Sequence, residues 1–199
     1  YDCCGLPLSG LVNEEAAQRE LDRVSGNLSR VGAREIAVLC PNCAAAFSDS
    51  LPCGQTTVYA KLRDLARVGL VRLNALDLPG AVFVPCPDRQ ARAWLSDLEP
   101  FFGLGVFTSA CSICCGAAFE LGDPVASDAA ARRVLAAVAA ECADRGIDDP
   151  VAYVYCASCA GKLERARRTC DDESCRRVRV VHALSALLGV DESPAVSAS

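Results

Sequence analysis

The sequence contains no methionine, a single histidine and a single tryptophan among its 199 residues. With His182 alone, neither a histidine-rich zinc site nor a Ser-His-Asp triad has much support. Apolar runs stay short of the roughly 18 residues that a membrane-spanning helix needs, so we expect no intrinsic membrane span. A glycine-rich phosphate loop is also missing, and we therefore expect any nucleotide or flavin to be bound by a partner.

Positive charge is in deficit as well. The chain carries 20 Lys and Arg against 25 Asp and Glu, which gives a net charge of −5 and an isoelectric point near 5.0. An acidic chain without a sustained basic stripe is not expected to bind nucleic acid or an anionic membrane. The arginines within 165–168 and 176–177 favour a solvated face, with docking to an acidic partner as the alternative.

An export signal is not recognisable either, since no secretory signal peptide opens the sequence. The chain is 52% hydrophobic and long enough to bury a core without disulfides. Its 14 cysteines therefore indicate metal-binding or redox thiols in a reducing compartment. We expect a cytoplasmic location, with membrane association only through a partner. Because the sequence opens at Tyr1 directly on a cysteine motif, we also expect it to be a fragment.

The cysteines follow a repeated pattern, in which a Cys-Cys-Gly is followed at a distance by a C-x-x-C. The first copy has Cys3, Cys4, Gly5, Cys40 and Cys43, and the second has Cys114, Cys115, Gly116, Cys156 and Cys159. Adjacent cysteines seldom bridge each other, because neighbouring Cα atoms are about 3.8 Å apart and an ordinary disulfide needs at least about 4.4 Å. Two such sets favour iron–sulfur clusters or zinc over disulfides.

A helix is predicted after Cys-Cys-Gly in each copy. We expect Asn13 to cap the first helix and Ser127 to cap the second, because both side chains can accept from free N–H groups. Gly32 and Gly146 follow the two apolar patterns and are expected at the helix ends, where a left-handed residue is common.

A short apolar run then leads into each C-x-x-C. The runs are 36–39 and 151–155, and each is typical of a parallel strand buried on both faces. Helices near 44–50 and 161–168 are expected to follow. This order places each C-x-x-C at the carboxyl end of a strand, where α/β folds build their sites, and near a helix N-terminus that stabilises thiolates. Further elements are expected as helices at 57–67 and 183–188 and as strands at 81–84 and 178–181.

The sequence therefore predicts an α/β fold of two similar repeats with short parallel sheets, related by a pseudo-twofold axis. The first repeat, 1–75, is expected to be truncated at its N-terminus, and the second repeat spans 76–190. The small, polar tail 191–199 is expected to be disordered.

On these residues the chain resembles the cysteine-rich CCG-domain family over positions 3 to about 190. This family occurs in the heterodisulfide reductase B subunit and in iron–sulfur subunits of glycolate, lactate and anaerobic glycerol-3-phosphate dehydrogenases. Its pattern is an upstream cysteine, then Cys-Cys-Gly, then C-x-x-C. The second copy matches in full with Cys86 as the upstream cysteine, which we favour over Cys111 because Cys86 follows a strand. The first copy lacks its upstream cysteine.

The resemblance implies that each cysteine set holds a [4Fe–4S] cluster of the noncubane type, with zinc in one repeat as the alternative. The implied metal ligands are Cys3, Cys4, Cys40, Cys43, Cys86, Cys114, Cys115, Cys156 and Cys159. Gly5 and Gly116 are expected to let backbone N–H groups approach the cluster closely, since glycine has no Cβ.

The remaining cysteines have no place in this pattern. Cys142 lies on the apolar helix face and is expected in the core, as is Trp94. Cys53 and Cys170 follow their C-x-x-C motifs at nearly equal distances. Cys170 and Cys175 bracket an acidic segment, for which a zinc or redox role and an exposed loop are the two interpretations.

The function expected from the sequence is that of an iron–sulfur subunit in a heterodisulfide reductase-like oxidoreductase. It would transfer electrons through its clusters to reduce a small disulfide. A ferredoxin-like or flavin-bearing subunit is the expected electron donor. The alternatives are an electron-relay subunit of a flavin-linked dehydrogenase, a zinc-binding structural module and a metal-free dithiol protein.

Overall fold

A computed structural model describes residues 12–47 and 50–190 of the chain. Cys3, Cys4 and Gly5, and the tail 191–199, lie outside the described residues. The first repeat is thus represented by its C-x-x-C, and the predictions made for its Cys-Cys-Gly and for the tail stay predictions.

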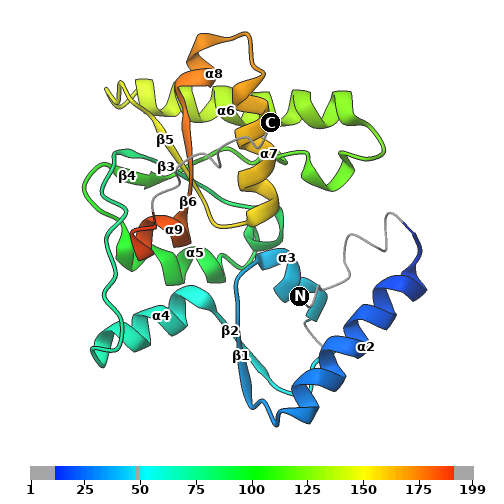
Figure 1. Ribbon diagram of the computed structural model, residues 1–199. Coiled ribbons are helices and arrows are strands. Elements are labelled where there is room, and N and C mark those ends of the chain that lie inside the picture. Colours follow the sequence, from blue (N-terminus) through cyan, green and yellow to red (C-terminus); the bar gives the residue numbers. More distant parts are fainter. Residues whose placement is uncertain (1–11, 48–49, 191–199) are drawn as a thin grey trace, which may run out of the picture.

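Two short parallel sheets form the framework (Figure 1). Strand β1 (Glu35–Val38) pairs with β2 (Gly54–Thr57). The second sheet has four strands in the order β4-β3-β5-β6, with parallel neighbours throughout. Its strands are β3 (Gly80–Phe83), β4 (Val106–Thr108), β5 (Val151–Val154) and β6 (Arg179–His182). The predicted α/β class with short parallel sheets is confirmed.

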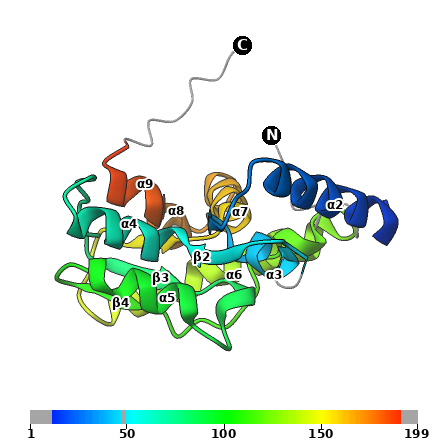
Figure 2. The ribbon, with the colours of Figure 1, turned by 90° about the horizontal axis from the view of Figure 1, so that it is seen from below.

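Helices alternate with these strands along the chain. The α-helices are α2 (Glu14–Arg30), α3 (Pro41–Phe47), α4 (Val58–Arg67), α5 (Ala93–Leu98), α6 (Pro124–Ala143), α7 (Ala157–Arg168), α8 (Glu173–Arg177) and α9 (Ala183–Leu188). Three short 3₁₀ helices are η1 (Cys86–Asp88), η2 (Glu99–Phe101) and η3 (Ala117–Phe119). Figure 2 shows α4 on one side of β2 and α3 on the other. Strands β2 and β4 and helices α5 and α8 are elements that the sequence pattern did not predict.

Helices cover both faces of the four-stranded sheet. Successive residues of a strand point to opposite faces, so each strand contributes side chains to both sides. Ala81, Phe83 and Val154 pack against α6, α7 and α8. Val82 and Tyr153 belong to the cluster on the other face, which includes residues of α5 and α9. Residues of α2, β1, α3 and α4 also join this second cluster, so both repeats share one core. Figure 1 shows α6, α7 and α8 on one side of the sheet and α5 and α9 on the other.

The two repeats have the same order of elements around their C-x-x-C motifs. In the first, β1 leads through Cys40 into α3, and the chain returns to the parallel neighbour β2 and then to α4. In the second, β5 leads through Cys156 into α7, and the chain returns to the parallel neighbour β6 and then to α9. The repeat seen in the cysteines is therefore also a repeat of local topology.

The first long helix begins as predicted, whereas the second does not. The Asn13 side chain accepts from the N–H of Ala16 at 2.8 Å and caps α2. Helix α6 begins at Pro124, with Asp123 as its N-cap, so the prediction that Ser127 caps it is wrong. Proline at the first helical position and aspartate before it are both favourable, and they start the helix one turn earlier. Gly32 and Gly146 follow the helix ends with positive φ, as expected.

Strand burial was predicted correctly for β5 and wrongly for β1. All four residues of β5 are buried, as expected of a central strand with helices on both faces. In β1, Glu35 and Ala37 are exposed and only Val38 is buried. In the described part of the chain, strand β1 belongs to a sheet of only two strands. Its apolar sequence was therefore not enough to predict that both of its faces are buried.

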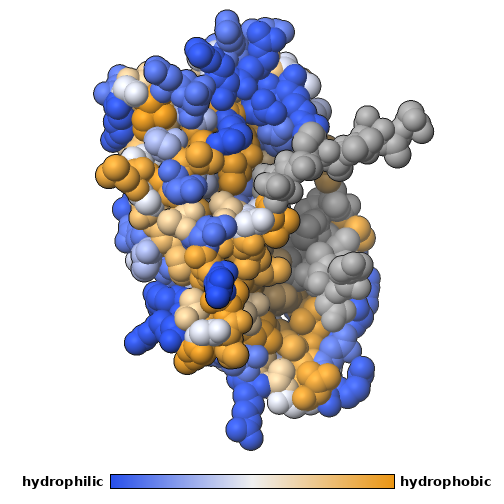
Figure 3. Space-filling view, turned by 60° about the vertical axis from the view of Figure 1, so that its left-hand side comes forward, coloured by the Kyte–Doolittle hydropathy of each residue, from blue (hydrophilic) through white to orange (hydrophobic). Residues whose placement is uncertain are grey.

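The surface combines charged regions with several exposed hydrophobic side chains. On the face shown in Figure 3, hydrophilic residues dominate the upper part and hydrophobic residues gather below it. Large exposed hydrophobic residues in the described ranges include Leu70, Leu104 and Val125. No described helix combines the length and the hydrophobicity that a membrane span requires.

Candidate metal centre

Seven cysteines from both repeats form a continuous row of neighbouring side chains, which we call the thiol row. Cys40 Sγ lies 4.0 Å from Cys156 Sγ, and Cys115 Sγ lies 3.1 Å from Cys159 Sγ. The other neighbours shift one another's pKa values, which gives the order Cys43, Cys40, Cys156, Cys159, Cys115, Cys114 and Cys86 along the row. The row thus contains every predicted cysteine ligand that the structure describes, and none of the seven forms a disulfide.

The ends of parallel strands bring these side chains together. Cys40 follows β1 and precedes α3, while Cys156 follows β5 and is the N-cap residue of α7. Cys86 opens η1 shortly after β3, and Cys114 and Cys115 lie in the loop that follows β4. The expectation that the C-x-x-C motifs lie at the carboxyl ends of strands is therefore confirmed, and it extends to the other cysteines of the row.

The row runs from a buried centre to an exposed end. Cys115, Cys156 and Cys159 are buried, whereas Cys86 is exposed. The 3₁₀ turn that carries Cys86 also lies against α3 of the first repeat. A group held by the row would therefore be largely shielded from water but reachable at the Cys86 end.

The thiols of Cys40 and Cys156 differ in pKa because of their neighbours. The Cys156 thiol, and after it the Cys43 thiol, hold the pKa of Cys40 well below its ordinary value of 9.0. For Cys156 itself, Cys159 lowers the pKa, but Cys40 and burial together raise it further, to about 11. The lowered pKa favours the thiolate form of Cys40, and either sulfur can be the donor of the contact between them. The side-chain amide of Asn42 donates to Cys156 Sγ, with Nδ2 at 3.5 Å.

Within the second repeat, the thiols of Cys115 and Cys159 also differ in pKa. The hydrogen bond between the Cys115 and Cys159 thiols lowers the pKa of Cys115 to about 6, whereas Cys115 and, after it, Cys156 raise the pKa of Cys159. Burial, and after it the neighbouring Cys114, raises the pKa of Cys86 to about 11. In the metal-free row the pKa values of Cys40 and Cys115 are thus lowered and those of Cys156, Cys159 and Cys86 are raised, and metal binding must displace the protons that remain.

Gly116 has a structural role that differs in part from the expected one. Its φ is +86°, and a Cβ on this residue would overlap the backbone of Ser127 in α6. The buried Ser127 hydroxyl donates to the Gly116 carbonyl at 2.9 Å, so the Cys-Cys-Gly loop is fastened directly to α6. The Gly116 N–H points to Cys114 Sγ at 3.4 Å, in line with the expectation that this N–H serves sulfur.

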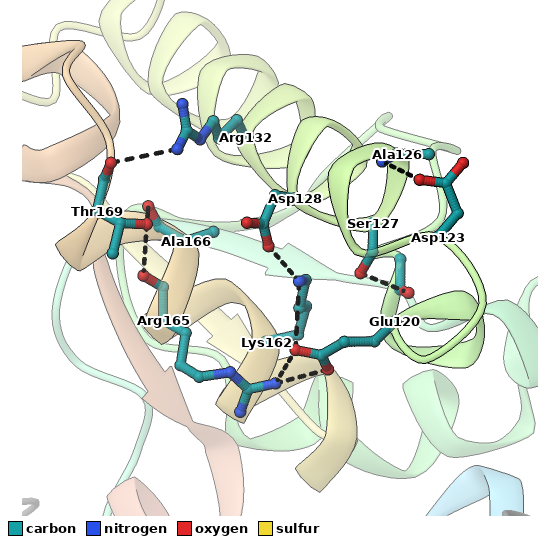
Figure 4. Close-up of polar contacts among 11 residues, drawn as sticks. Glu120, Asp123, Ala126, Ser127, Asp128, Arg132, Lys162, Arg165, Ala166 and Thr169 are labelled. Atoms are coloured by element: carbon teal, nitrogen blue, oxygen red, sulfur yellow. Dashed lines mark hydrogen bonds and ion pairs between the residues drawn. The ribbon is translucent and has the colours of Figure 1, made fainter. Parts of the chain in front are cut away.

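A buried lysine links the segments that carry the two motifs of the second repeat (Figure 4). Lys162 lies one turn after Cys159 in α7, is 1% exposed, and forms ion pairs with Glu120 and Asp128. Arg165 also binds Glu120, at 2.7 Å. Because Glu120 follows the Cys-Cys-Gly loop and Asp128 belongs to α6, the lysine ties α7 to the elements that hold Cys114 and Cys115.

Asp88 fixes the turn that carries Cys86. It is 2% exposed and accepts hydrogen bonds from the backbone N–H groups of Trp94 and Leu95, which start α5. The Tyr155 hydroxyl donates to the same carboxylate at 2.8 Å. Asp88, Asn42 and Lys162 were not singled out from the sequence, because isolated polar residues carry no spacing signal.

The other cysteines have separate surroundings. Cys142 is fully buried in α6 and Trp94 is 7% exposed, so both core predictions are confirmed. Cys170 and Cys175 are buried, and Cys175 Sγ donates to the Arg132 carbonyl at 3.8 Å, so the exposed-loop interpretation of this pair is wrong. Helix α8 folds the segment between them against α6 and α7. Cys111 lies in the loop before Cys114, where its N–H donates to the Ser109 hydroxyl.

The donor chemistry of the row suits metals that bind thiolates, either iron in a cluster or zinc. Within residues 12–47 and 50–190, no group of three or more His, Cys, Asp or Glu side chains is arranged to hold one metal ion. A cluster takes thiolate ligands at several irons, so its cysteines need not converge on one point. A row of seven thiols without a histidine supplies the ligands that such clusters use.

Comparison with known proteins adds little to this picture. No family model and no curated protein matches the chain. A solved structure that it resembles is that of an aspartate racemase homologue from Pyrococcus horikoshii, with a TM-score of 0.40 and 14% identity. The similarity covers 88% of this chain and 72% of that chain. A likeness this distant carries no argument about function.

Proposed function

We propose that this chain is an iron–sulfur subunit of a heterodisulfide reductase-like oxidoreductase. The observation that carries the proposal is the thiol row, in which Cys40 of the first repeat meets Cys156 of the second. Seven free thiols brought together at strand ends, with none of them paired in a disulfide, suit metal–thiolate binding.

The five cysteines of the second repeat would hold one cluster. They are Cys86, Cys114, Cys115, Cys156 and Cys159, and Cys40 and Cys43 extend the same row from the first repeat. A bound [4Fe–4S] cluster would supply one-electron chemistry, with which a small disulfide can be reduced in single-electron steps. A second cluster would need Cys3 and Cys4, together with an upstream cysteine that this sequence does not contain.

The protein would contribute shielding, charge balance and access. Burial of Cys115, Cys156 and Cys159 keeps water from the centre of the row. Lys162, which lies one turn beyond Cys159, is buried, and Glu120 and Asp128 balance its charge. The exposed Cys86 marks the end at which a disulfide substrate or an electron donor can reach the cluster.

The electron donor would be a partner subunit, either ferredoxin-like or flavin-bearing. We propose a cytoplasmic location for this complex, in line with the many reduced cysteines.

Anaerobic reconstitution with iron and sulfide tests the proposal. We expect a brown protein with about four irons and four acid-labile sulfides per chain held by the second repeat. Cys115→Ser should abolish this uptake, because Cys115 lies in the row. Cys142→Ser is the matched control, since Cys142 is as deeply buried but lies in the core of α6, and it should retain the iron.

The outcome also separates the alternatives. A colourless protein that takes up zinc through the same cysteines would replace the proposal with a zinc-binding module. Reduction of a small disulfide by the metal-free protein would replace it with dithiol exchange, in which the Cys40 thiolate is the nucleophile. Equal iron uptake by Cys115→Ser and the wild type would contradict the assignment of the row.

A further inference from the structure

Arg89 joins the two loops that carry the exposed end of the thiol row. It follows the 3₁₀ turn η1, and its N–H donates to the Cys86 carbonyl at 3.5 Å. Its guanidinium Nη2 donates to the Ile113 carbonyl at 2.6 Å, and Ile113 directly precedes Cys114. One side chain therefore reaches from the turn of Cys86 to the start of the Cys-Cys-Gly loop.

The positive charge of Arg89 is partly removed from water without an ion pair. The half-buried arginines of the described ranges are Arg63, Arg89, Arg132 and Arg167. Arg63 and Arg167 are ion-paired with carboxylates. In Arg89 the Nε atom is buried and has no hydrogen-bond partner among the residues that the structure describes. A charge withdrawn from water is unfavourable unless a counterion balances it.

The carboxylate that follows Cys86 most closely does not balance this charge. Asp88 accepts hydrogen bonds from two backbone N–H groups at the start of α5 and from the Tyr155 hydroxyl. These three donors hold the carboxylate on the side of α5. The guanidinium of Arg89 is bonded instead to the loop that leads into Cys114.

The surroundings of Arg89 suit an anionic group at the Cys86 end of the row. Cysteines bind metals as thiolates, so a metal–thiolate group held there carries negative charge. The guanidinium keeps its charge at any physiological pH, and its Nε–H is free for a further partner. Burial and the Cys114 thiol raise the pKa of Cys86, and the charge of Arg89 opposes this rise.

We propose that Arg89 is a positioning residue that supplies the counterion for the anionic metal–thiolate group held at the exposed end of the thiol row. This inference rests on the proposed function, because it requires a group bound by the row. A nearby positive charge stabilises the more negative, reduced state of such a group and thereby raises its reduction potential. Arg89 is not one of the ligands, and its bond to the Ile113 carbonyl holds the Cys86 turn against the Cys-Cys-Gly loop.

Arg132 is the matched control for everything except position. It is also half-buried, donates through Nη2 to the Thr169 carbonyl at 3.2 Å, and has a buried Nε without a partner in the described ranges. Thr169 lies at the carboxyl end of α7, whereas Cys156 and Cys159 lie at its start. Figure 4 shows Arg132 on α6 beside Thr169.

The reconstituted protein gives the first readout. Arg89→Gln removes the charge and should shift the midpoint potential to more negative values. A tenfold change in the ratio of oxidised to reduced centre corresponds to about 59 mV for a one-electron couple, and we expect a shift of that order. Arg89→Lys keeps the charge and should shift the potential less, and Arg132→Gln should leave it unchanged. Equal shifts in Arg89→Gln and Arg89→Lys, or no shift in Arg89→Gln, would overturn the inference.

The metal-free protein gives a second readout that needs no bound group. Cys86 is the exposed thiol of the row, and either neutral iodoacetamide or anionic iodoacetate can alkylate it. The ratio of the two rates, followed by mass spectrometry of the Cys86 peptide, reports the local charge, since the thiolate fraction affects both reagents equally. Arg89→Gln should lower the rate of iodoacetate relative to iodoacetamide several-fold, whereas Arg89→Lys and Arg132→Gln should keep the wild-type ratio.

Failure of the proposed function is distinguishable from failure of this inference. If the wild type takes up no iron but binds zinc, the proposed function fails on that result. Competition for zinc with a chelator then decides the inference, because Arg89→Gln must bind zinc more weakly than Arg132→Gln. An unchanged alkylation ratio in Arg89→Gln refutes the role of Arg89 whichever metal the wild type binds.

Discussion

The Sγ atoms of Cys40 and Cys156 lie 4.0 Å apart, although 116 positions separate the two residues in the chain. Each belongs to the C-x-x-C of a different repeat, so the two motifs meet at one junction. Asn42, between the cysteines of the first motif, adds a contact to Cys156 Sγ at 3.5 Å. The first repeat therefore contributes to the surroundings of the second repeat's cysteines.

This junction predicts that Cys40 influences iron binding by the second repeat. Replacing Cys40 by serine removes the thiolate next to Cys156, and we expect the iron content after reconstitution to fall and the visible spectrum to change. The matched control is Cys53→Ser, because Cys53 is also half-buried in the first repeat but is not part of the row. Identical iron content and spectra in the two variants would show that the repeats act independently.

Gly116 provides a prediction about backbone strain. Alanine at this position must adopt a φ of +86° and place its Cβ against the backbone of Ser127, so we expect a loss of about 2–4 kcal/mol in the free energy of unfolding. Gly146→Ala is the control, since Gly146 has a φ of +68° but open space around it. That variant should lose only about 1 kcal/mol. Urea denaturation measures both, and equal losses would contradict the contact with α6.

The opposite pKa shifts of Cys115 and Cys86 predict how the stability of the metal-free protein depends on pH. The pKa of Cys115 is lowered to about 6, so its contribution is present above the unfolded value of 9.0 and is lost as the pH falls through 6. The pKa of Cys86 is raised to about 11, so its contribution is present below 9.0 and is lost as the pH rises through 11. From these thiols, stability should be greatest near pH 9.

A variant separates the Cys115 contribution from that of other titrating groups. Cys115→Ser should reduce the gain in unfolding free energy between pH 6 and pH 9 relative to the wild type, measured by urea denaturation in the presence of a reductant. Cys142→Ala serves as the control, because its thiol is buried away from the row. A pH profile of Cys115→Ser that parallels the wild type would contradict the assigned shift.

The sequence contained most of the information on local structure. Polar residues such as Asn13 and glycines such as Gly32 marked helix ends, because capping depends on neighbours in the chain. The buried run at 151–155 marked a central strand. Strand β2, with the sequence Gly-Gln-Thr-Thr, was missed because it is short and polar, and it is held in place by pairing with β1.

Prediction of the site succeeded for the residue types and failed for the arrangement. Spacing identified the cysteines, since motif cysteines recur at fixed distances. It could not show that Cys40 meets Cys156, because this contact depends on how the repeats pack. Nor could it single out Lys162, whose importance comes from burial and not from any motif.

The buried ion pairs of Lys162 give the last prediction. Its side chain is 1% exposed, whereas the side chains of Glu120 and Asp128 are 33% and 50% exposed. Lys162→Met leaves two carboxylates that water can solvate, and we expect it to change the unfolding free energy by no more than about 1 kcal/mol. The double variant Glu120→Gln with Asp128→Asn leaves a buried charge without a counterion and should lose about 3–5 kcal/mol. Urea denaturation of both variants checks this order. A larger loss in Lys162→Met than in the double variant would show that the lysine stabilises the protein mainly through its packing between α6 and α7, and not through its charge.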